Sequence, residues 1–148
     1  MGFFDSLDIS ASGLTAERLR MDVTAENLAN AQTTKGADGK PYRRKEVVLQ
    51  EVPQGGFGAS LAAAMGARGA SRPGGVEVSG IVEDQTPYKT VYDPGHPDAD
   101  AKGYVRMPNV DTVAEMVDLI TAQRGYEANV TAMQTAKTMF TRTLDILK

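Results

Sequence analysis

The strongest constraint on the fold is a long helical pattern at each end of the chain. In the first pattern, over about residues 4–28, apolar or small side chains recur at alternating steps of three and four, the spacing of one helix face. Only Arg18 interrupts this row. The row consists of Phe4, Leu7, Ala11, Leu14, Arg18, Met21, Ala25 and Leu28. We therefore predict an amphipathic helix, roughly 38 Å long at about 1.5 Å per residue.

The second pattern covers about residues 111–147 and begins where Asn109 and Asp111 offer capping side chains after Pro108. Its row consists of Met116, Leu119, Gln123, Tyr126, Val130, Met133, Lys137, Phe140, Leu144 and Leu147. A second row widens the apolar face with Val113, Val117, Ile120 and Met139. The helix would be roughly 55 Å long, which exceeds what a compact chain of 148 residues needs. This length favours a coiled coil or a multi-helix assembly over two helices packed in one core.

The segment between the helical patterns is polar and rich in turn residues. Short runs of β-branched and aromatic residues predict strands, with an irregularity near Gly80. These strands are expected at residues 45–52, 76–82, 88–92 and 104–107. Residues 53–75 are rich in Gly, Ala, Ser and Pro and predict a flexible loop.

We therefore predict an α+β fold, in which long N- and C-terminal α-helices pack as a coiled-coil or helical-bundle layer, with a small, mainly β middle domain. The expected domains are an N-terminal helix over residues 1–30, the β domain over 31–108 and a C-terminal helix over 109–148. The C-terminal pattern contains several threonines and Gly125, all of which cost helix stability relative to Ala. Both helices are therefore expected to depend on packing against something else.

The composition excludes several kinds of chemistry. The chain has no cysteine and a single histidine, so disulfides, Cys-ligated metals and sites built from two histidines are excluded. The formal net charge is -3, and no segment resembles a basic tail, so no nucleic-acid partner is expected. No stretch is long and apolar enough to cross a bilayer, and no Sec-type signal is visible at the start. We expect no cofactor, no metal and no membrane insertion.

The local motifs that resemble functional sites each favour a structural interpretation. His96 lies in a turn-rich stretch without a nucleophile pattern, which indicates a turn residue rather than a general base. Residues 98–103 resemble the start of a calcium loop, but Lys102 stands where an oxygen ligand belongs and Asn109 stands where the loop needs a Glu. The basic run at residues 43–45 is typical of a solvated strand edge. No catalytic, cofactor-binding or metal-binding set remains, so we do not expect an enzyme.

One motif at the end of the first helical pattern indicates a family. Residues 27–36, Asn-Leu-Ala-Asn-Ala-Gln-Thr-Thr-Lys-Gly, resemble the Asn-(Leu/Ile)-Ala-Asn-x-x-Thr signature of bacterial flagellar axial proteins, which form the rod and the hook. Further stretches look like proximal rod members of this family, and the resemblance covers nearly the whole chain. These stretches are residues 39–43, 92–100, 103–105, 107–111 and 124–129. The departure is the Gly/Ala-rich run at residues 53–75, which is longer than the family pattern.

The resemblance implies a structural role in the bacterial flagellum. Such proteins are exported unfolded by the flagellar type III secretion apparatus, without cleavage. They then polymerise with further copies of themselves and with other flagellar rod proteins into the hollow basal-body rod. This rod crosses the periplasm and transmits torque. A helical tube needs contacts that do not close on a dimer, and terminal helices with little autonomous stability are suited to ordering on assembly.

The apolar rows and the signature asparagines together give a candidate assembly interface. It consists of Leu7, Leu14, Met21, Leu28, Asn27, Asn30, Met116, Leu119, Gln123, Tyr126, Val130, Met133, Phe140, Leu144 and Leu147. The polar residues Arg18, Gln123 and Lys137 within the rows have two interpretations. They fix the register of neighbouring subunits, or they mark where a row turns to solvent.

A second class of function fits the same helical ends. A secreted adaptor or effector with coiled-coil ends would bind a single partner and form a soluble stoichiometric complex. A rod subunit instead needs neighbours on several faces. Size-exclusion chromatography of the chain beside its candidate rod partners separates these two hypotheses.

Overall fold

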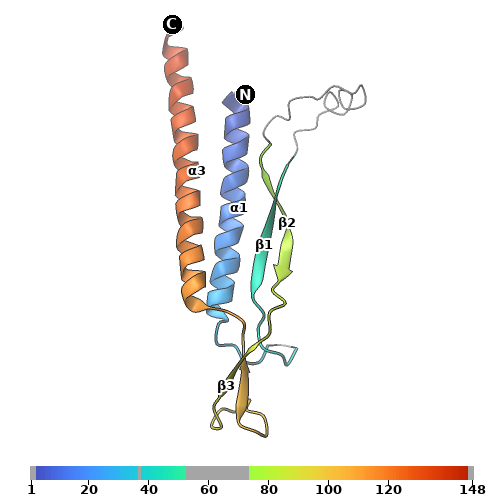
Figure 1. Cartoon of the computed structure of the whole chain (residues 1–148). Coiled ribbons are helices and arrows are strands. Elements are labelled where there is room, and N and C mark those ends of the chain that lie inside the picture. Colours follow the sequence, from blue (N-terminus) through green and yellow to red (C-terminus); the bar gives the residue numbers. More distant parts are fainter. Residues whose placement is uncertain (1–2, 37, 53–73, 147–148) are drawn as a thin grey trace, which may run out of the picture.

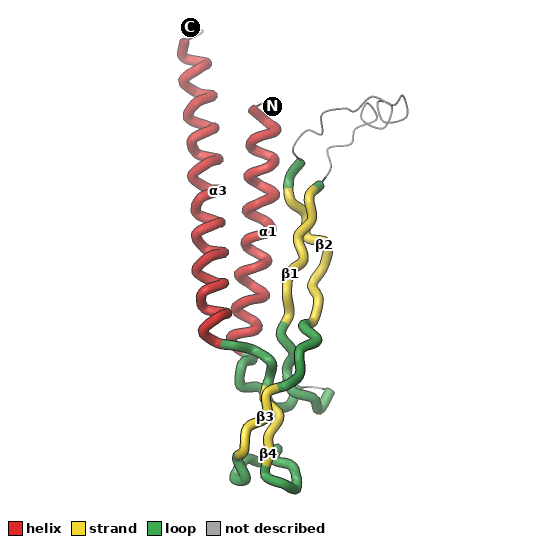
Figure 2. Tube along the Cα trace, in the orientation of Figure 1, coloured by secondary structure: helices red, strands yellow, loops and turns green. Residues whose placement is uncertain are grey.

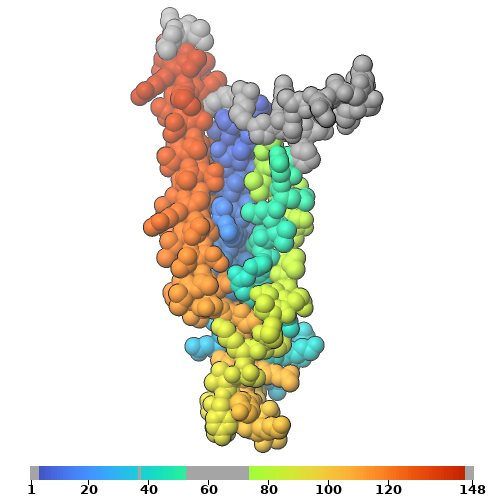
Figure 3. All heavy atoms as spheres, viewed as in Figure 1, coloured from blue at the N-terminus to red at the C-terminus, as the bar shows by residue number. Residues whose placement is uncertain are grey.

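Two long antiparallel helices and a β-hairpin lie side by side in the computed structural model, which describes residues 3–36, 38–52 and 74–146. Helix α1 (Phe3–Ala29) lies between helix α3 (Thr112–Ile146) and the hairpin of strands β1 (Lys45–Glu51) and β2 (Val76–Glu83), as Figure 1 shows. The space-filling view in Figure 3 shows an elongated molecule. The predicted α+β class with long terminal helices is confirmed.

Both helices begin and end close to the predicted positions. Asp111 caps α3, because its Oδ1 accepts a hydrogen bond from the backbone N–H of Val113 (3.0 Å) and its carbonyl accepts one from Glu115 (2.9 Å). At the end of α1, the N–H groups of Asn30 and Ala31 still donate to carbonyls of the last turn, Glu26 (3.1 Å) and Leu28 (3.3 Å). The chain then turns and enters the hairpin.

Strands β1 and β2 pair antiparallel, from Lys45 opposite Glu83 to Glu51 opposite Val76. The register shifts between Val48, opposite Gly80, and Leu49, opposite Val78. Ser79 is therefore the additional residue of a bulge, next to the predicted irregularity at Gly80.

Strands β3 (Lys89–Tyr92) and β4 (Tyr104–Met107) form a second antiparallel hairpin, which projects beyond the end of the helix pair in Figure 2. It is a separate two-stranded sheet. The first hairpin, in contrast, packs against α1. The division of the chain into three separate domains stays a prediction. The flexible loop predicted for residues 53–75 lies, up to residue 73, outside the described residues.

The described core is thin and its apolar side chains are small or medium in size. The buried apolar residues are Ala16, Val23, Val105, Val110, Ala122 and Ala136. Many large apolar side chains are instead exposed, among them Val117, Ile120 and Leu144. A core this small stabilises the helices only modestly.

Candidate assembly interface

Small residues on α1 and α3 allow the two helices to approach each other closely. A Cβ added to Gly13 would lie 3.0 Å from Nδ2 of Asn129, and a Cβ added to Gly125 would lie 3.2 Å from the carboxyl carbon of Glu17. Ala122 is fully buried in the same region. The helices therefore approach closely where a larger side chain would not fit.

The predicted apolar row of α3 lies beside this contact rather than in it. Met116 is 45% exposed, Phe140 39% and Leu144 46%. Leu119, Tyr126, Val130 and Met133 are half-buried. The second predicted row is exposed as well, at Val113, Val117, Ile120 and Met139. A single chain thus leaves much of the apolar surface of α3 in water, which is typical of an interaction surface.

On α1, the structure separates the predicted interface residues into two groups. Leu7, Leu14, Met21 and Leu28 are half-buried, as is Asn30. Asn27 is buried, with an exposed fraction of 1%, and its side chain bonds within the chain. Leu147, the last residue of the predicted C-terminal row, lies outside the described residues. The role of these residues in assembly stays a prediction.

The polar residues of the rows face solvent in the single chain. Arg18, Gln123 and Lys137 are exposed. The Nε2 of Gln123 donates to Oε1 of Glu127, one turn further along the same helix (3.2 Å). A role for Gln123 in fixing register therefore requires a neighbouring subunit.

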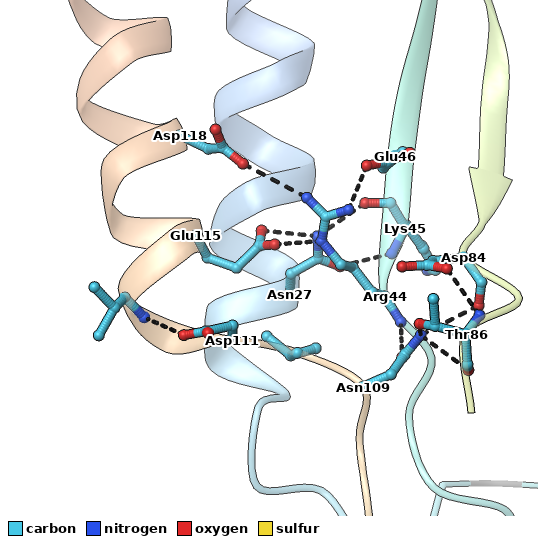
Figure 4. Close-up of polar contacts among 12 residues, drawn as sticks. Asn27, Arg44, Lys45, Glu46, Asp84, Thr86, Asn109, Asp111, Glu115 and Asp118 are labelled. Carbon is cyan, nitrogen blue, oxygen red and sulfur yellow. Dashed lines mark hydrogen bonds and ion pairs between the residues drawn. The ribbon is translucent and has the colours of Figure 1, made fainter. Parts of the chain in front are cut away.

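Asn27 joins α1 to the start of the β1–β2 hairpin (Figure 4). Its Oδ1 accepts hydrogen bonds from the backbone N–H of Lys45 (2.9 Å) and from the hydroxyl of Tyr42 (2.9 Å). Its Nδ2 donates to the carbonyl of Lys45 (2.8 Å) and to Oε2 of Glu115 on α3 (3.0 Å). The amide uses both donors and both acceptor positions, and it pairs with Lys45 as a neighbouring strand would.

Glu115 brings α3 into the same cluster. Its side chain is 1% exposed, and its Oε1 accepts from Nε of Arg44 at 2.5 Å. The guanidinium of Arg44 also pairs with Glu46 and lies 3.5 Å from a carboxylate oxygen of Asp118. We call Asn27, Tyr42, Arg44 and Glu115, with the backbone of Lys45, the polar joint. It connects α1, α3 and the hairpin at one end of the helix pair (Figure 4).

Asn109 fixes the approach of the chain to this joint. Its Oδ1 accepts from the backbone N–H of Arg44 (2.9 Å), and its Nδ2 donates to Oγ1 of Thr86 (2.8 Å) and to the carbonyl of Asp84 (3.2 Å). The segment that leads into α3 is thereby attached to the residues that precede β1 and follow β2, at the open end of the first hairpin.

The joint shifts the pKa of two of its members. Burial, followed by the negative charges of Glu26, Glu115 and Glu83, raises the pKa of Tyr42 from 10.0 to about 12. Partial burial lowers the pKa of Arg44, but its hydrogen bonds to the carboxylates of Glu115 and Glu46 outweigh this effect and hold the pKa above its ordinary value. Both groups therefore keep their protons at neutral pH.

His96 and the calcium-loop-like stretch at residues 98–103 form turns between the strands of the second hairpin. His96 is half-buried, and its Nδ1 accepts from the backbone N–H of Asp98 (3.1 Å). Asp100 accepts from the N–H groups of Lys102 (2.8 Å) and Tyr104 (3.0 Å). These bonds are those of a turn-forming carboxylate, and they lower the pKa of Asp100.

The described part of the chain has neither a metal-binding cluster nor a membrane-spanning helix. Within residues 3–36, 38–52 and 74–146, no three His, Cys, Asp or Glu side chains are grouped so that they would bind a metal ion. In the same residues, neither helix combines the length and the apolar character needed to span a membrane.

The sequence reasoning missed most of the polar joint. It named Asn27, but it treated Arg44 as part of a solvated strand edge and did not single out Glu115. The close contact between the helices did have a signal, since small residues recur at helical spacing on both of them, at Gly13 with Ala16 and at Ala122 with Gly125.

Terminal helices that pack on each other through small residues and leave their larger apolar side chains exposed are typical of a structural subunit that assembles with others. Comparison with protein families supports this class. Residues 7–37 match the family model "Flagella basal body rod protein", and residues 101–146 match "Flagellar basal body rod FlgEFG protein C-terminal". These are families of structural flagellar proteins and not of enzymes.

Full-length relatives define the family more closely. The chain is 50% identical over 152 residues to the flagellar basal-body rod protein FlgC of Bacillus subtilis (strain 168), with 100% of both chains covered. It is 47% identical over 146 residues to FlgC of Escherichia coli O157:H7, covering 99% of this chain and 98% of that protein. FlgC of Aquifex aeolicus (strain VF5) is 41% identical over 149 residues, with 100% and 99% covered. The chain belongs to the FlgC family of flagellar basal-body rod proteins, and it is a structural subunit of the basal-body rod.

Proposed function

We propose that the chain is a subunit of the proximal part of the rod and polymerises there through the exposed apolar faces of its terminal helices. The observation that carries this proposal is the position of the apolar rows. Residues such as Met116 and Leu144 remain about half exposed after α1 and α3 have packed. Covering such side chains is favourable by about 25 cal/mol per Å² of apolar surface, so neighbouring helices in the rod are their natural partners.

The proposed partners are further copies of this chain and other flagellar rod proteins. Contacts that continue from subunit to subunit without closing generate a helical tube. A hollow tube of this kind would cross the periplasm and transmit torque. The polar joint supports this mechanical role, because its hydrogen bonds connect the hairpin directly to both helices.

We also propose that the chain reaches the rod through the flagellar type III secretion apparatus in an unfolded state. The thin core supports this route, because a protein with a small buried apolar surface unfolds at a low energetic cost. The exposed apolar rows then find partners only at the growing end of the rod.

The experiment is to replace Leu144 by Asp in the flagellated host. The side chain of Leu144 is 46% exposed, so the variant is expected to fold and to be exported normally. A charge buried without a partner in a subunit interface is strongly unfavourable, so rod completion and swimming should be lost. Thr143→Asp is the matched control, since Thr143 is an exposed polar residue in the same turn.

Swimming of the Leu144→Asp strain at the rate of the parent would show that the apolar row is not an assembly surface. The single-partner adaptor hypothesis has a different expected result. It would give a complex of fixed size with one rod protein in size-exclusion chromatography, whereas a rod subunit would form larger species when several rod proteins are present.

A further inference from the structure

The first turns of α3 present a buried acid to the contact with α1. Glu115 is 1% exposed and fully enclosed between α1 and the chain that leads into β1. A buried carboxylate is expensive unless hydrogen bonds and an opposite charge compensate it. The packing of α3 on α1 therefore depends on the partners that reach this carboxylate.

The helices alone supply only part of this compensation. Among the described residues, α1 contributes Nδ2 of Asn27, 3.0 Å from Oε2 of Glu115. The opposite charge comes from Arg44, which immediately precedes β1 and donates from its Nε to Oε1 at 2.5 Å. The orientation of Asn27 depends on the same segment, because Tyr42 and the backbone of Lys45 hold its amide.

We infer that the polar joint makes closure of the helix pair conditional on formation of the β1–β2 hairpin. In a chain whose hairpin has not formed, Arg44 is not held beside Glu115, and docking of α3 would bury a charge with an incomplete set of partners. The hairpin, once formed, brings Arg44 and Lys45 into position and completes the site. The joint thus works as a folding checkpoint that acts within one subunit.

The position of Arg44 supports this order of events. Asn109 Oδ1 accepts from its backbone N–H, and Asn109 in turn donates to Asp84 and Thr86, just after β2. The guanidinium is therefore placed by residues that flank both strands of the hairpin. The pairing of β1 with β2, which starts at Lys45 and Glu83, brings these flanking residues together.

The checkpoint can be tested in the full-length chain by measuring the separation of the helices. Because the chain has no cysteine, Ala25→Cys and Thr121→Cys provide two specific sites for nitroxide labels on exposed positions of α1 and α3. Electron spin resonance then reports the distribution of distances between the labels. The labelled parent should give one narrow peak.

Two substitutions test separately whether helix closure needs the charge of Arg44 and whether it needs the hairpin. Arg44→Met removes the opposite charge but keeps an apolar side chain of similar length. Val48→Pro removes a backbone donor inside β1 that faces β2, opposite Gly80, at a distance from Glu115 along the strand. Each variant should lose the narrow distance peak and show a broad distribution, because α3 no longer docks stably beside α1.

The decisive measurement repeats both variants with Glu115→Leu. Without the buried carboxylate, α3 has no charge to compensate, so Arg44→Met/Glu115→Leu and Val48→Pro/Glu115→Leu should recover the narrow peak. Arg142→Met is the control, since Arg142 is exposed on α3, far along the helix from Glu115, and its replacement should leave the peak unchanged.

Two results would overturn the inference. If Arg44→Met or Val48→Pro keeps the narrow peak while Glu115 is present, helix closure does not depend on the hairpin. If the peak stays broad after Glu115→Leu is added, the hairpin supports α3 by some means other than compensation of this charge. Both results concern the single chain, so neither depends on whether the chain polymerises as proposed.

Discussion

Glu17 of α1 lies across Gly125 of α3, so close that a Cβ on the glycine would lie 3.2 Å from the carboxyl carbon of the glutamate. On the other side of the contact, Gly13 has the same relationship with Asn129, at 3.0 Å. Each helix therefore supplies one glycine and one longer polar side chain that covers the partner's glycine. The close approach of the helices depends on these two positions.

Replacement of Gly125 by Leu should destabilise the chain although Leu favours the helix. The gain in helix propensity is about 0.8 kcal/mol, whereas forcing a large side chain into a packed contact costs about 1–3 kcal/mol. We expect a net loss of stability in urea denaturation, seen as a lower midpoint. Ala128→Leu, at an exposed position of the same helix, should be neutral or stabilising. Equal midpoints for both variants would contradict the close packing at Gly125.

Replacement of Asn27 by Ala should cost about 3 kcal/mol of unfolding free energy, because buried polar groups of Lys45, Tyr42 and Glu115 lose their partner. The matched control is Asn30→Ala, three residues further along α1. Asn30 Nδ2 donates only to the carbonyl of Glu26 in its own helix, and its Oδ1 accepts from Thr33. The control should cost less than about 1 kcal/mol. Similar losses for the two asparagines would show that Asn27 is not the centre of the joint.

Replacement of Gln123 by Leu should separate the stability of the chain from its assembly. Gln123 is exposed and bonds only to Glu127 of its own helix, so the stability of the single chain should change by no more than about 0.5 kcal/mol. If its amide fixes the register of a neighbouring subunit, the variant should be exported normally but complete fewer rods. Electron microscopy of isolated basal bodies measures this. Rods completed at the normal rate would exclude the register role.

Stability at alkaline pH should depend on Tyr42. Its pKa is raised to about 12 by burial and nearby acids, compared with 10.0 for the ordinary group. Between these values the unfolded chain has lost the proton while the folded chain still binds it, so the stabilising contribution is complete below pH 10 and is lost as pH rises through about 12. Urea denaturation of the parent and of Tyr42→Phe should show a steeper loss for the parent in this window. Parallel pH profiles would contradict the raised pKa.

The sequence predicted the elements of this fold better than the contacts between them. The helix α3 extends from Thr112 to Ile146, close to the predicted range, because an apolar row that repeats over ten turns leaves little freedom in the assignment. Strand β4 begins and ends at the predicted Tyr104 and Met107. Local periodicity determines such elements, and it is readable from the sequence alone.

The polar joint was harder to predict from the sequence because its members are distant from one another along the chain. Arg44 and Glu115 are separated by 71 positions, and no periodic pattern connects a basic residue before a strand with an acid in the first turn of a helix. Gly125 was interpreted as a loss of helix propensity, because the side chain that covers it, Glu17, is on the other helix. The sequence did not show directly that the apolar rows face outward. It only led us to expect that they take part in assembly, and that role stays a prediction.

The location of the polar joint gives the helix pair one fixed end and one adaptable end. Asn27 and Glu115 hold α1 and α3 together where α3 begins, whereas contacts further along the pair involve small side chains such as Gly13 and Ala136. The apolar side chains buried along this part of the pair are small, so we expect local opening of the two helices to begin at their far ends and to reach the joint last.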